Sequence, residues 1–318
     1  MGPELADAAS RPWHGLELRH LAALTAVIDE GSFHRAARQL GYSQSAVSQQ
    51  VAALERAIGH RLVDRGAGEQ IRLTKIGSIV HHHAKAINDH LSAAQADVAR
   101  LTSKAAESLH LGVYQSVSAQ LFPRILTEFV SASTVEVVLT ETVGDVELFG
   151  LLERGELDLA FVALPTTTGP FEWTDLLRDR YVLVVRSESP MAAVGRSLTP
   201  EEVATLPLIT FRDCRSTEYA LASLRSTGAE PRVVFRSDDN EIVQGMVAAG
   251  LGAALIPSLA VSPHDDLVAL DLDGFPPRIT SIAWHRERSL SPACQLFIDV
   301  ARRVSGSMPG AAVDTAAA

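Results

Sequence analysis

Hydroxyl and amide side chains gather on one face of a helix predicted over residues 43–58. Apolar residues at spacings of four, three and four define its opposite, core-facing side: Val47, Val51, Leu54 and Ile58. The outward side offers, beside Ala52, four polar residues: Gln44, Ser45, Ser48 and Gln49. A Gln amide can bond two edge atoms of adenine, and a Ser hydroxyl can bond a base edge or a phosphate. The set predicts a helix that contacts DNA, although a solvated position is the alternative for each residue taken singly.

Three helices and a hairpin are predicted to form the domain that positions this face, residues 17–76. Ser32 and Ser43 are of the residue type that caps helix starts, and Gly41 and Gly59 are of the type that ends helices. The helices are expected at 17–29, 32–40 and 43–58. Two short strands, near 61–64 and 70–74, flank a Gly-containing turn with basic residues on or beside it, Arg65 and Arg72. Together these elements predict a winged helix-turn-helix.

The stretch from Leu18 to Gly77 resembles the DNA-binding domain of LysR-type transcriptional regulators. The blocks that carry the resemblance are Gly-Ser-Phe, Ala-Ala, Ser-Gln-Ser-Ala-Val-Ser, Leu-Glu and Leu-Thr-x-x-Gly, in the expected order and spacing. Val63 stands where Phe is usual, and Ile76 where Ala is usual. Both exchanges are apolar and affect local packing rather than the identity of the module.

The resemblance implies a set of DNA contacts and partners. The third helix would enter the major groove. Contacts to the DNA backbone are implied for Ser32, Phe33, Arg35, Arg65, Arg72 and Thr74. The implied partner is double-stranded DNA with an interrupted inverted repeat in promoters, and RNA polymerase is a further candidate partner.

Residues 77–105 contain no Pro and no Gly after Gly77, which predicts one long linker helix. Apolar residues recur along it at alternating spacings of four and three: Val80, Ala84, Ile87, Leu91, Ala94, Val98 and Leu101. An unbroken seam of this kind favours self-association of two helices. Packing of the helix on its own domain is the alternative. The resemblance makes this helix the dimerisation element and implies a homodimer or a homotetramer.

The remaining chain, residues 106–304, alternates short apolar runs with helices and predicts an α/β domain with a mostly parallel sheet. Its length favours two lobes, the first at about 109–163 and 266–304 and the second at about 164–265. Such lobes are similar to the periplasmic-binding-protein-like sensor of LysR-type regulators, and the best-matching segments are 238–241 and 247–257. The overall fold class expected is therefore α/β, with an N-terminal α-rich winged helix-turn-helix, a long linker helix and this two-lobed effector domain.

Ligands of parallel-strand lobes bind beyond the carboxyl ends of strands, where helices begin. Two loops meet that description, 114–118 and 211–216, and both contain hydroxyls or Arg beside a helix start. We expect a small anionic effector there, held by helix N–H groups and an Arg fork. The alternative is that the hydroxyls only cap helices and that Arg212 and Arg215 pair with Asp213 or Glu218. With the hinge and turn positions that the resemblance implies, the candidate effector residues are Ser116, Val117, Ser118, Ala163, Pro165, Phe211, Arg212, Asp213, Cys214, Arg215, Asn240, Gly250 and Leu251.

Composition supports a DNA-binding protein once the net charge of −10 is divided along the chain. Residues 11–75 hold nine Lys and Arg against six acidic residues, whereas residues 76–318 hold nineteen against thirty. One basic module on an acidic body suits a protein with one phosphate-facing end. The two ends of the chain, 1–16 and 305–318, are small, polar or Ala-rich and are expected to be disordered.

Other classes of protein are disfavoured. The start of the chain has no basic, apolar signal pattern, and no apolar run is long enough for a membrane span, which disfavours a secreted solute-binding protein. Cys214 and Cys294, 80 positions apart, form no disulfide framework and favour the cytoplasm. Consecutive side chains of a helical His81-His82-His83 cannot converge on one metal ion. No catalytic motif supports an enzyme, so no metal or cofactor is expected apart from an unidentified small-molecule co-inducer.

Overall fold

The computed structural model describes Trp13 and residues 15–64, 71–102, 108–164, 169–212 and 214–308. The predicted disordered segment up to His14 (Trp13 apart), the turn that contains Arg65, and the candidate residues Pro165 and Asp213 lie outside the described residues, as does the tail from residue 309. The chain divides into two compact units, residues 1–99 and 100–318. No helix in the described part of the chain is both long and apolar enough to cross a membrane.

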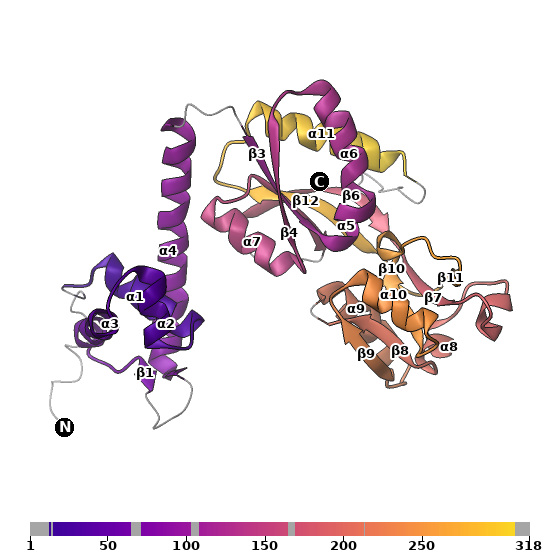
Figure 1. Ribbon diagram of the computed structural model, residues 1–318, viewed down its shortest axis with the longest axis horizontal. Helices are drawn as coiled ribbons and strands as arrows, with labels where there is room; N and C mark the ends of the chain where they lie inside the picture. The colour runs from indigo at the N-terminus through magenta and orange to yellow at the C-terminus, as the bar shows by residue number, and fades with distance from the viewer. Residues whose placement is uncertain are drawn as a thin grey trace. The chain divides into compact units, whose positions relative to one another are not determined.

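The first unit is the predicted winged helix-turn-helix together with most of a long helix (Figure 1). Its elements are α1 (Leu18–Asp29), α2 (Phe33–Leu40), α3 (Gln44–Ile58), β1 (Val63–Asp64), β2 (Arg72–Leu73) and α4 (Lys75–Thr102). The Ser32 and Ser43 side chains accept hydrogen bonds from the N–H groups of Arg35 and Ala46, as caps do. Gly41 and Gly59 end α2 and α3 with φ of +69° and +80°, the left-handed conformation that glycine tolerates best.

Helix α4 begins two residues before the predicted start of the linker. The Thr74 hydroxyl accepts a 2.9 Å bond from the Gly77 N–H and donates a 2.8 Å bond to the Arg61 carbonyl, so it caps the helix and ties it to the wing. Gly77 then packs against the chain at Leu62, where an added Cβ would lie 2.0 Å from the carbonyl oxygen. The backbones approach this closely because position 77 has no side chain.

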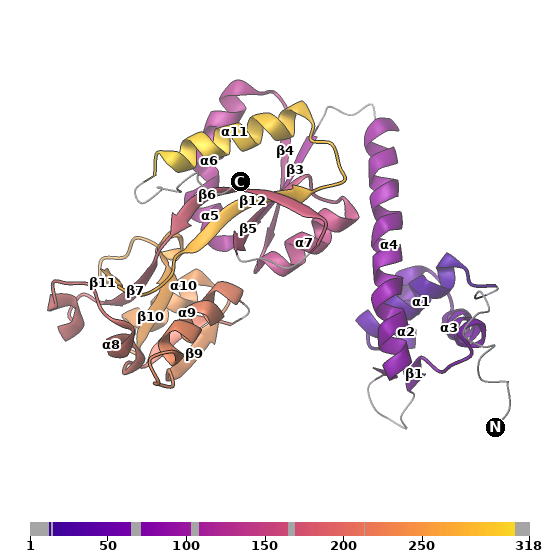
Figure 2. The same cartoon turned by 180° about the vertical axis from the view of Figure 1, so that it is seen from behind.

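The second unit holds two five-stranded sheets, one in each lobe. Lobe 1 has the strand order β4-β3-β5-β12-β6, with α6 and α11 on one face and α7 on the other (Figures 1 and 2). Its elements are β3 (Ser108–Tyr114), α5 (Gln115–Gln120), α6 (Phe122–Ala132), β4 (Glu136–Thr142), α7 (Asp145–Arg154), β5 (Leu159–Leu164), β6 (Phe171–Asp179), β12 (Arg278–His285) and α11 (Pro292–Gly306).

Lobe 2 has the strand order β11-β7-β10-β8-β9. Its elements are β7 (Tyr181–Arg186), η2 (Pro190–Ala193), α8 (Pro200–Ala204), β8 (Leu208–Phe211), α9 (Arg215–Arg225), β9 (Val233–Ser237), α10 (Asn240–Ala248), β10 (Ala253–Pro257), η3 (Ser258–Ala260) and β11 (Leu267–Asp271). Strand β7 alternates between two apolar layers: Leu183 and Val185 pack with the residues of α8 and α9, and Val182 and Val184 pack with those of α10.

Each sheet is mixed: four of its strands run in one direction, as expected of a mostly parallel sheet, and one strand, β12 or β7, runs antiparallel to its two neighbours. Two other expectations about this unit need correction. Strand β6 belongs to lobe 1, although residues 164–265 were expected in lobe 2. Strand β11 belongs to lobe 2, although residues 266–304 were expected in lobe 1. Residues 305–308 are not part of a disordered tail, since α11 continues to Gly306 and Ser305 is fully buried.

Strand β6 escapes sequence analysis because its pattern is irregular. A register shift opposite Thr280 and Ser281 leaves Leu176 without a ladder partner, and the neighbours Leu176 and Leu177 are both buried. Such a bulge breaks the strict alternation by which a half-buried strand is recognised. The chain therefore crosses from lobe 1 to lobe 2 between Asp179 and Tyr181 and returns before Arg278.

Candidate DNA-binding face and effector cleft

The two sides of α3 are divided as predicted. Val47, Val51 and Leu54 are fully buried in the core of the first unit. Gln44, Ser45 and Gln49 are exposed, and Ser48 is half-buried. The Ser45 and Ser43 hydroxyls lie 3.0 Å apart, so these hydroxyls interact at the amino end of the helix. The outward face of α3 thus presents amides and hydroxyls to solvent.

The other predicted DNA contacts have local structural roles as well. Phe33 is half-buried and packs against the core, and Thr74 caps α4. The Arg35 side chain donates a 2.9 Å bond from Nε to the Glu30 carbonyl, yet it is 62% exposed. Arg72 is exposed on β2. Arg35 and Arg72 therefore keep surface that a phosphate could reach.

The predicted seam on α4 divides into two parts. Val80 and Ala84 are buried at 6% and 1% exposure in the core of the DNA-binding unit, so they leave little surface for a partner. For these two residues the structure therefore shows the alternative arrangement, in which the helix packs on its own domain. The following seam residues are exposed, with Ile87 at 42%, Leu91 at 40% and Val98 at 60%, and Ala94 also exposed. The Leu101 side chain lies outside the described residues.

A cleft lies between the two lobes of the second unit and has an inner and an outer part. The inner chamber has a volume of about 40 Å³, and its wall is formed by Tyr114, Gln115, Ser116, Val143, Phe211, Cys214, Asp238, Asn240 and Arg278. The outer part, of about 520 Å³, is lined by Gln115, Glu141, Thr142, Val143, Arg212, Ser237, Asp238 and Asp239. Of the candidate effector residues, Ser116, Phe211, Cys214 and Asn240 line the inner chamber and Arg212 lines the outer part. The first loop and the second loop therefore do meet at one cavity.

Arg278, which the sequence analysis did not identify, is the buried cation of this cleft. Its side chain is 5% exposed and bonds the fully buried Asp179 carboxylate from Nε at 2.8 Å and Nη2 at 2.6 Å. Nη2 also donates to the Ser116 hydroxyl at 2.7 Å, and the guanidinium carbon lies 5.1 Å from the centre of the Tyr114 ring. A charged residue directly after Pro276-Pro277 and before a buried strand was the available signal.

The electrostatic environment keeps Arg278 charged. Burial lowers its pKa, but the Tyr114 hydroxyl and the Asp179 carboxylate outweigh that effect, so the pKa lies above the usual value. Burial raises the pKa of Tyr114 and keeps its hydroxyl protonated, although nearby Arg278 and the Thr280 hydrogen bond act in the opposite direction. The chamber therefore contains a guanidinium cation beside a neutral phenol.

Arg215, one of the two residues expected to supply an anion-binding fork beside Arg212, is paired with a carboxylate of lobe 1. Its Nη2 and Nε lie 2.6 and 3.3 Å from the carboxylate of Asp145, at the start of α7 in lobe 1. Glu218, one of the two expected partners, pairs with Arg236 and Arg225 instead, and Asp213, the other, lies outside the described residues. Arg215 thus links the lobes, as does Gln115, whose Oε1 accepts a 3.1 Å bond from the Asn240 N–H.

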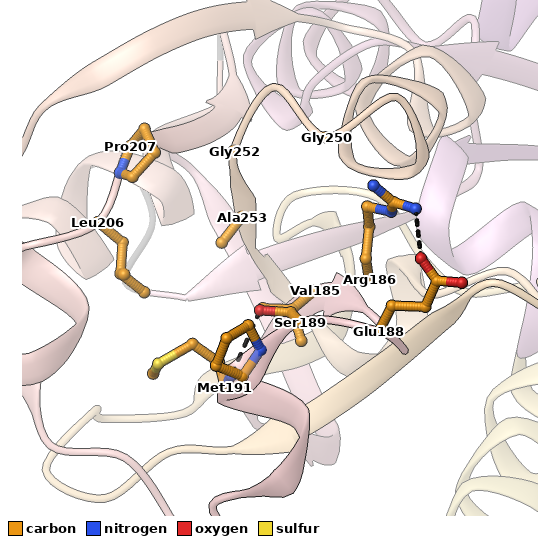
Figure 3. A pocket seen from close by; sticks show the side chains of 11 residues that line it. Val185, Arg186, Glu188, Ser189, Met191, Leu206, Pro207, Gly250, Gly252 and Ala253 are labelled. Carbon is orange, nitrogen blue, oxygen red and sulfur yellow. Dashed lines mark hydrogen bonds and ion pairs between the residues drawn. The ribbon is translucent and has the colours of Figure 1, made fainter.

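Several other candidates do not line the cleft. Val117 is fully buried in the core of lobe 1, and Ala163 pairs with Thr280 inside the sheet. Ser118 donates to the Gln115 carbonyl and to Glu141. Leu251 is 55% exposed in the turn after α10. Gly250 lines a different cavity of about 380 Å³ in lobe 2, beside the Arg186–Glu188 ion pair (Figure 3). The helix-end turn faces away from the cleft because α10 runs from the cleft to its far end.

The two units define a class of protein: a DNA-binding regulator with a winged helix-turn-helix and a two-lobed domain that has a cavity between its lobes. Family models agree with this division. Residues 18–78 match the "Bacterial regulatory helix-turn-helix protein, lysR family" model, and residues 103–306 match the "LysR substrate binding domain" model. The chain belongs to the LysR family of bacterial transcriptional regulators.

Individual relatives are transcriptional regulators that align with this chain over most of their own length. The HTH-type transcriptional regulator EstR of Acinetobacter baylyi is 25% identical over 92% of this chain and 98% of its own length. A probable hydrogen peroxide-inducible genes activator of Mycobacterium avium is 30% identical over 76% of this chain and 78% of its own length. The crystal structure of HinK, a LysR family regulator of Pseudomonas aeruginosa, superposes with a TM-score of 0.57 at 22% identity, over 91% of this chain and 98% of that one. The protein is thus a DNA-binding transcriptional regulator with an effector domain, and not an enzyme.

Proposed function

We propose that a small-molecule effector binds in the cleft between the lobes of the second unit and controls promoter binding or activation. The observation that supports this site is the shared wall of the cavity: Ser116 comes from lobe 1, and Phe211, Cys214 and Asn240 come from lobe 2. A ligand that contacts both lobes can bind one arrangement of the lobes more tightly than another. It then stabilises that arrangement and so can shift the regulator between states. No other cofactor is part of this proposal.

DNA recognition is assigned to the outward face of α3. Gln49→Ala should cost about 1–3 kcal/mol at the cognate site and relax base preference at one position. Arg72→Ala should weaken all sequences about equally and reduce the salt slope by about one. Gel shifts on the upstream intergenic fragment and on random DNA measure both effects, with exposed Gln295→Ala in α11 as the control. Equal effects of the Gln49 and Arg72 changes on both DNAs would contradict the assignment.

Self-association is assigned to the α4 seam from Ile87 to Leu101, in which Ile87, Leu91, Ala94 and Val98 are exposed. A dimer or a tetramer of two dimers would match an interrupted inverted repeat, because two-fold protein symmetry is mirrored in the operator. Leu91→Glu should yield monomers with much weaker operator affinity. Gln95→Glu adds the same charge to α4 outside the seam and should leave the assembly intact. Light scattering that finds the Leu91 variant fully dimeric would rule out the seam.

One further partner and a location complete the proposal. RNA polymerase is the candidate partner at promoters where the regulator activates transcription. The cytoplasm is the compartment that holds both its DNA and the polymerase.

A further inference from the structure

The charges in the interlobe cleft are arranged in order of depth. The deepest charged group is the Arg278 guanidinium, at 5% exposure on the wall of the inner chamber. Asp238, 27% exposed, borders both parts of the cleft. The outer part adds Glu141 and Asp239 and one cation, Arg212, whose Nε lies 4.0 Å from Asp238. A ligand would thus meet a cation inside and an excess of carboxylates at the mouth.

Hydrogen-bonding groups in the inner chamber are left for a ligand. A guanidinium has five N–H donors, and Arg278 uses those of Nε and Nη2 on Asp179 and Ser116. Nη1 has no hydrogen-bond partner among the described residues. It is also not among the described side-chain atoms that are both fully buried and without a partner. The Ser116 hydroxyl accepts from Arg278 and so retains its own hydrogen to donate.

Asn240 makes the same point independently. The residue is 6% exposed on the chamber wall, and its main-chain groups bond Gln115 and Gln244. The described residues include no hydrogen-bond partner of its side-chain amide, and this amide is not one of the described side-chain groups that are fully buried without a partner. The amide therefore keeps surface from which it can donate to a ligand. Three donors in one chamber, from Arg278, Ser116 and Asn240, suit a carboxylate.

The outer part disfavours a purely anionic ligand. Glu141 accepts the Ser118 hydroxyl, and Asp239 caps α10, so both carboxylates are held in place as acceptors. Like charges at the mouth repel a second anion, whereas an ammonium group gains from them. The volumes fit the same division, since about 40 Å³ admits a carboxylate-sized group and about 520 Å³ admits the body of a small molecule.

We infer that the cleft takes a dipolar ligand of the α-amino acid class, with its carboxylate on Arg278, Ser116 and Asn240 and its ammonium group toward Asp238 and Glu141. The inference rests on the proposed effector site. It replaces the purely anionic ligand expected on Arg212 or Arg215, because Arg215 is paired with Asp145 and Arg212 lies 4.0 Å from the Asp238 carboxylate.

Matched probes test the inference on the full-length protein. The proteinogenic amino acids are screened by thermal shift at 10 mM, and hits are measured by calorimetry beside the acid that lacks the amino group and the amine that lacks the carboxyl. For leucine these are 4-methylpentanoate and 3-methylbutylamine. We expect at least one amino acid to bind at least tenfold more tightly than both of its analogues. An analogue that binds equally well, or a screen without any binder, would overturn the inference.

Two variants separate this inference from the proposed site. Asp238→Asn should weaken amino-acid binding at least tenfold and improve binding of the matched acid, whereas Asp265→Asn, on an exposed loop of lobe 2, should change neither. An Asp238 variant that binds the amino acid unchanged contradicts the inference. Val143→Trp fills the wall shared by both parts of the cleft from a 58% exposed position. If the matched acids bind as well as the amino acids and Val143→Trp abolishes their binding, the cleft is the effector site but the dipolar class is wrong. If ligand binding survives Val143→Trp, the effector site itself lies elsewhere.

Discussion

Neutralising Asp179 should destabilise the effector unit far more than neutralising an exposed carboxylate. Asp179 is 1% exposed at the end of β6. Its Oδ1 accepts from the Ser258 hydroxyl at 2.7 Å and the Leu259 N–H at 3.1 Å, and its Oδ2 accepts from Arg278. Asp179→Asn keeps the shape but leaves the Arg278 cation buried without a counter-ion. Breaking a buried pair in this way costs about 3–5 kcal/mol, a large share of a domain's stability of about 5–15 kcal/mol.

Asp271→Asn is the matched control, because Asp271 forms a 2.7 Å pair with Arg180 in which both side chains are more than half exposed (56% and 65%). Exposed pairs contribute about 0–1 kcal/mol. Two of the three tryptophans, Trp173 in β6 and Trp284 in β12, lie in lobe 1, so urea unfolding followed by tryptophan fluorescence reports mainly on that lobe. If the two variants lose equal stability, the reasoning from desolvation of Arg278 is wrong. The double variant Asp179→Leu/Arg278→Met should recover most of the loss, because it removes both buried charges.

Two further predictions concern a glycine and an acid-sensitive pair. Gly77→Ala should destabilise the DNA-binding unit by about 1–3 kcal/mol in urea unfolding, since its Cβ would meet the Leu62 carbonyl, whereas helical Gly245→Ala meets no atom within 4 Å and should gain about 0.5–1 kcal/mol. A tolerated Gly77→Ala would mean that the contact between α4 and Leu62 is not close. Hydrogen bonds from the Arg196 side chain and the Thr199 N–H lower the pKa of Glu202 to about 2. Because the pKa of Glu202 is lower in the folded state, its ionised carboxylate stabilises the fold above the unfolded value of 4.5, and this stabilisation is lost as the pH falls toward 2. Glu202→Gln should therefore flatten the fall in the urea midpoint between pH 5 and pH 3.

Local features of this protein were predictable from sequence, whereas contacts between distant segments were not. Ser32, Ser43, Gly41 and Gly59 act on their own helices, so their residue types predict the boundaries of α2 and α3. The two sides of α3 follow from periodicity alone. Val80 and Ala84 pack in the core of the DNA-binding unit, whereas the rest of the described seam is exposed. The heptad pattern is the same whether a seam residue packs on its own domain or on a partner helix, so it could not predict this division.

The cleft shows the same limit more sharply. Ser116, Phe211 and Cys214 were found because each stands at a strand end or a helix start, which sequence can locate, and Asn240 was implied by the family resemblance. Arg278 contacts Asp179 and Ser116 at separations of 99 and 162 residues, and Arg215 contacts Asp145 at 70. The local signal at Arg278, a charged residue between Pro276-Pro277 and a buried strand, does not show which distant groups it contacts, and periodicity cannot show that Arg215 is already paired.

The position of Arg278 suggests how a ligand in the cleft could affect the whole effector unit. Strands β6 and β12 lie side by side where the chain leaves lobe 1 and returns to it (Figure 2). Asp179 ends β6 and Arg278 begins β12, so their ion pair joins the two connections between the lobes. Asp179 also bonds Ser258 and Leu259 of lobe 2, while Arg278 bonds Ser116 of lobe 1. A carboxylate on Nη1 of Arg278 would therefore contact the residue that holds both connections and both lobes. Because a ligand shifts an equilibrium only by its difference in affinity for the two states, a contact at this junction is more effective than one confined to a single lobe.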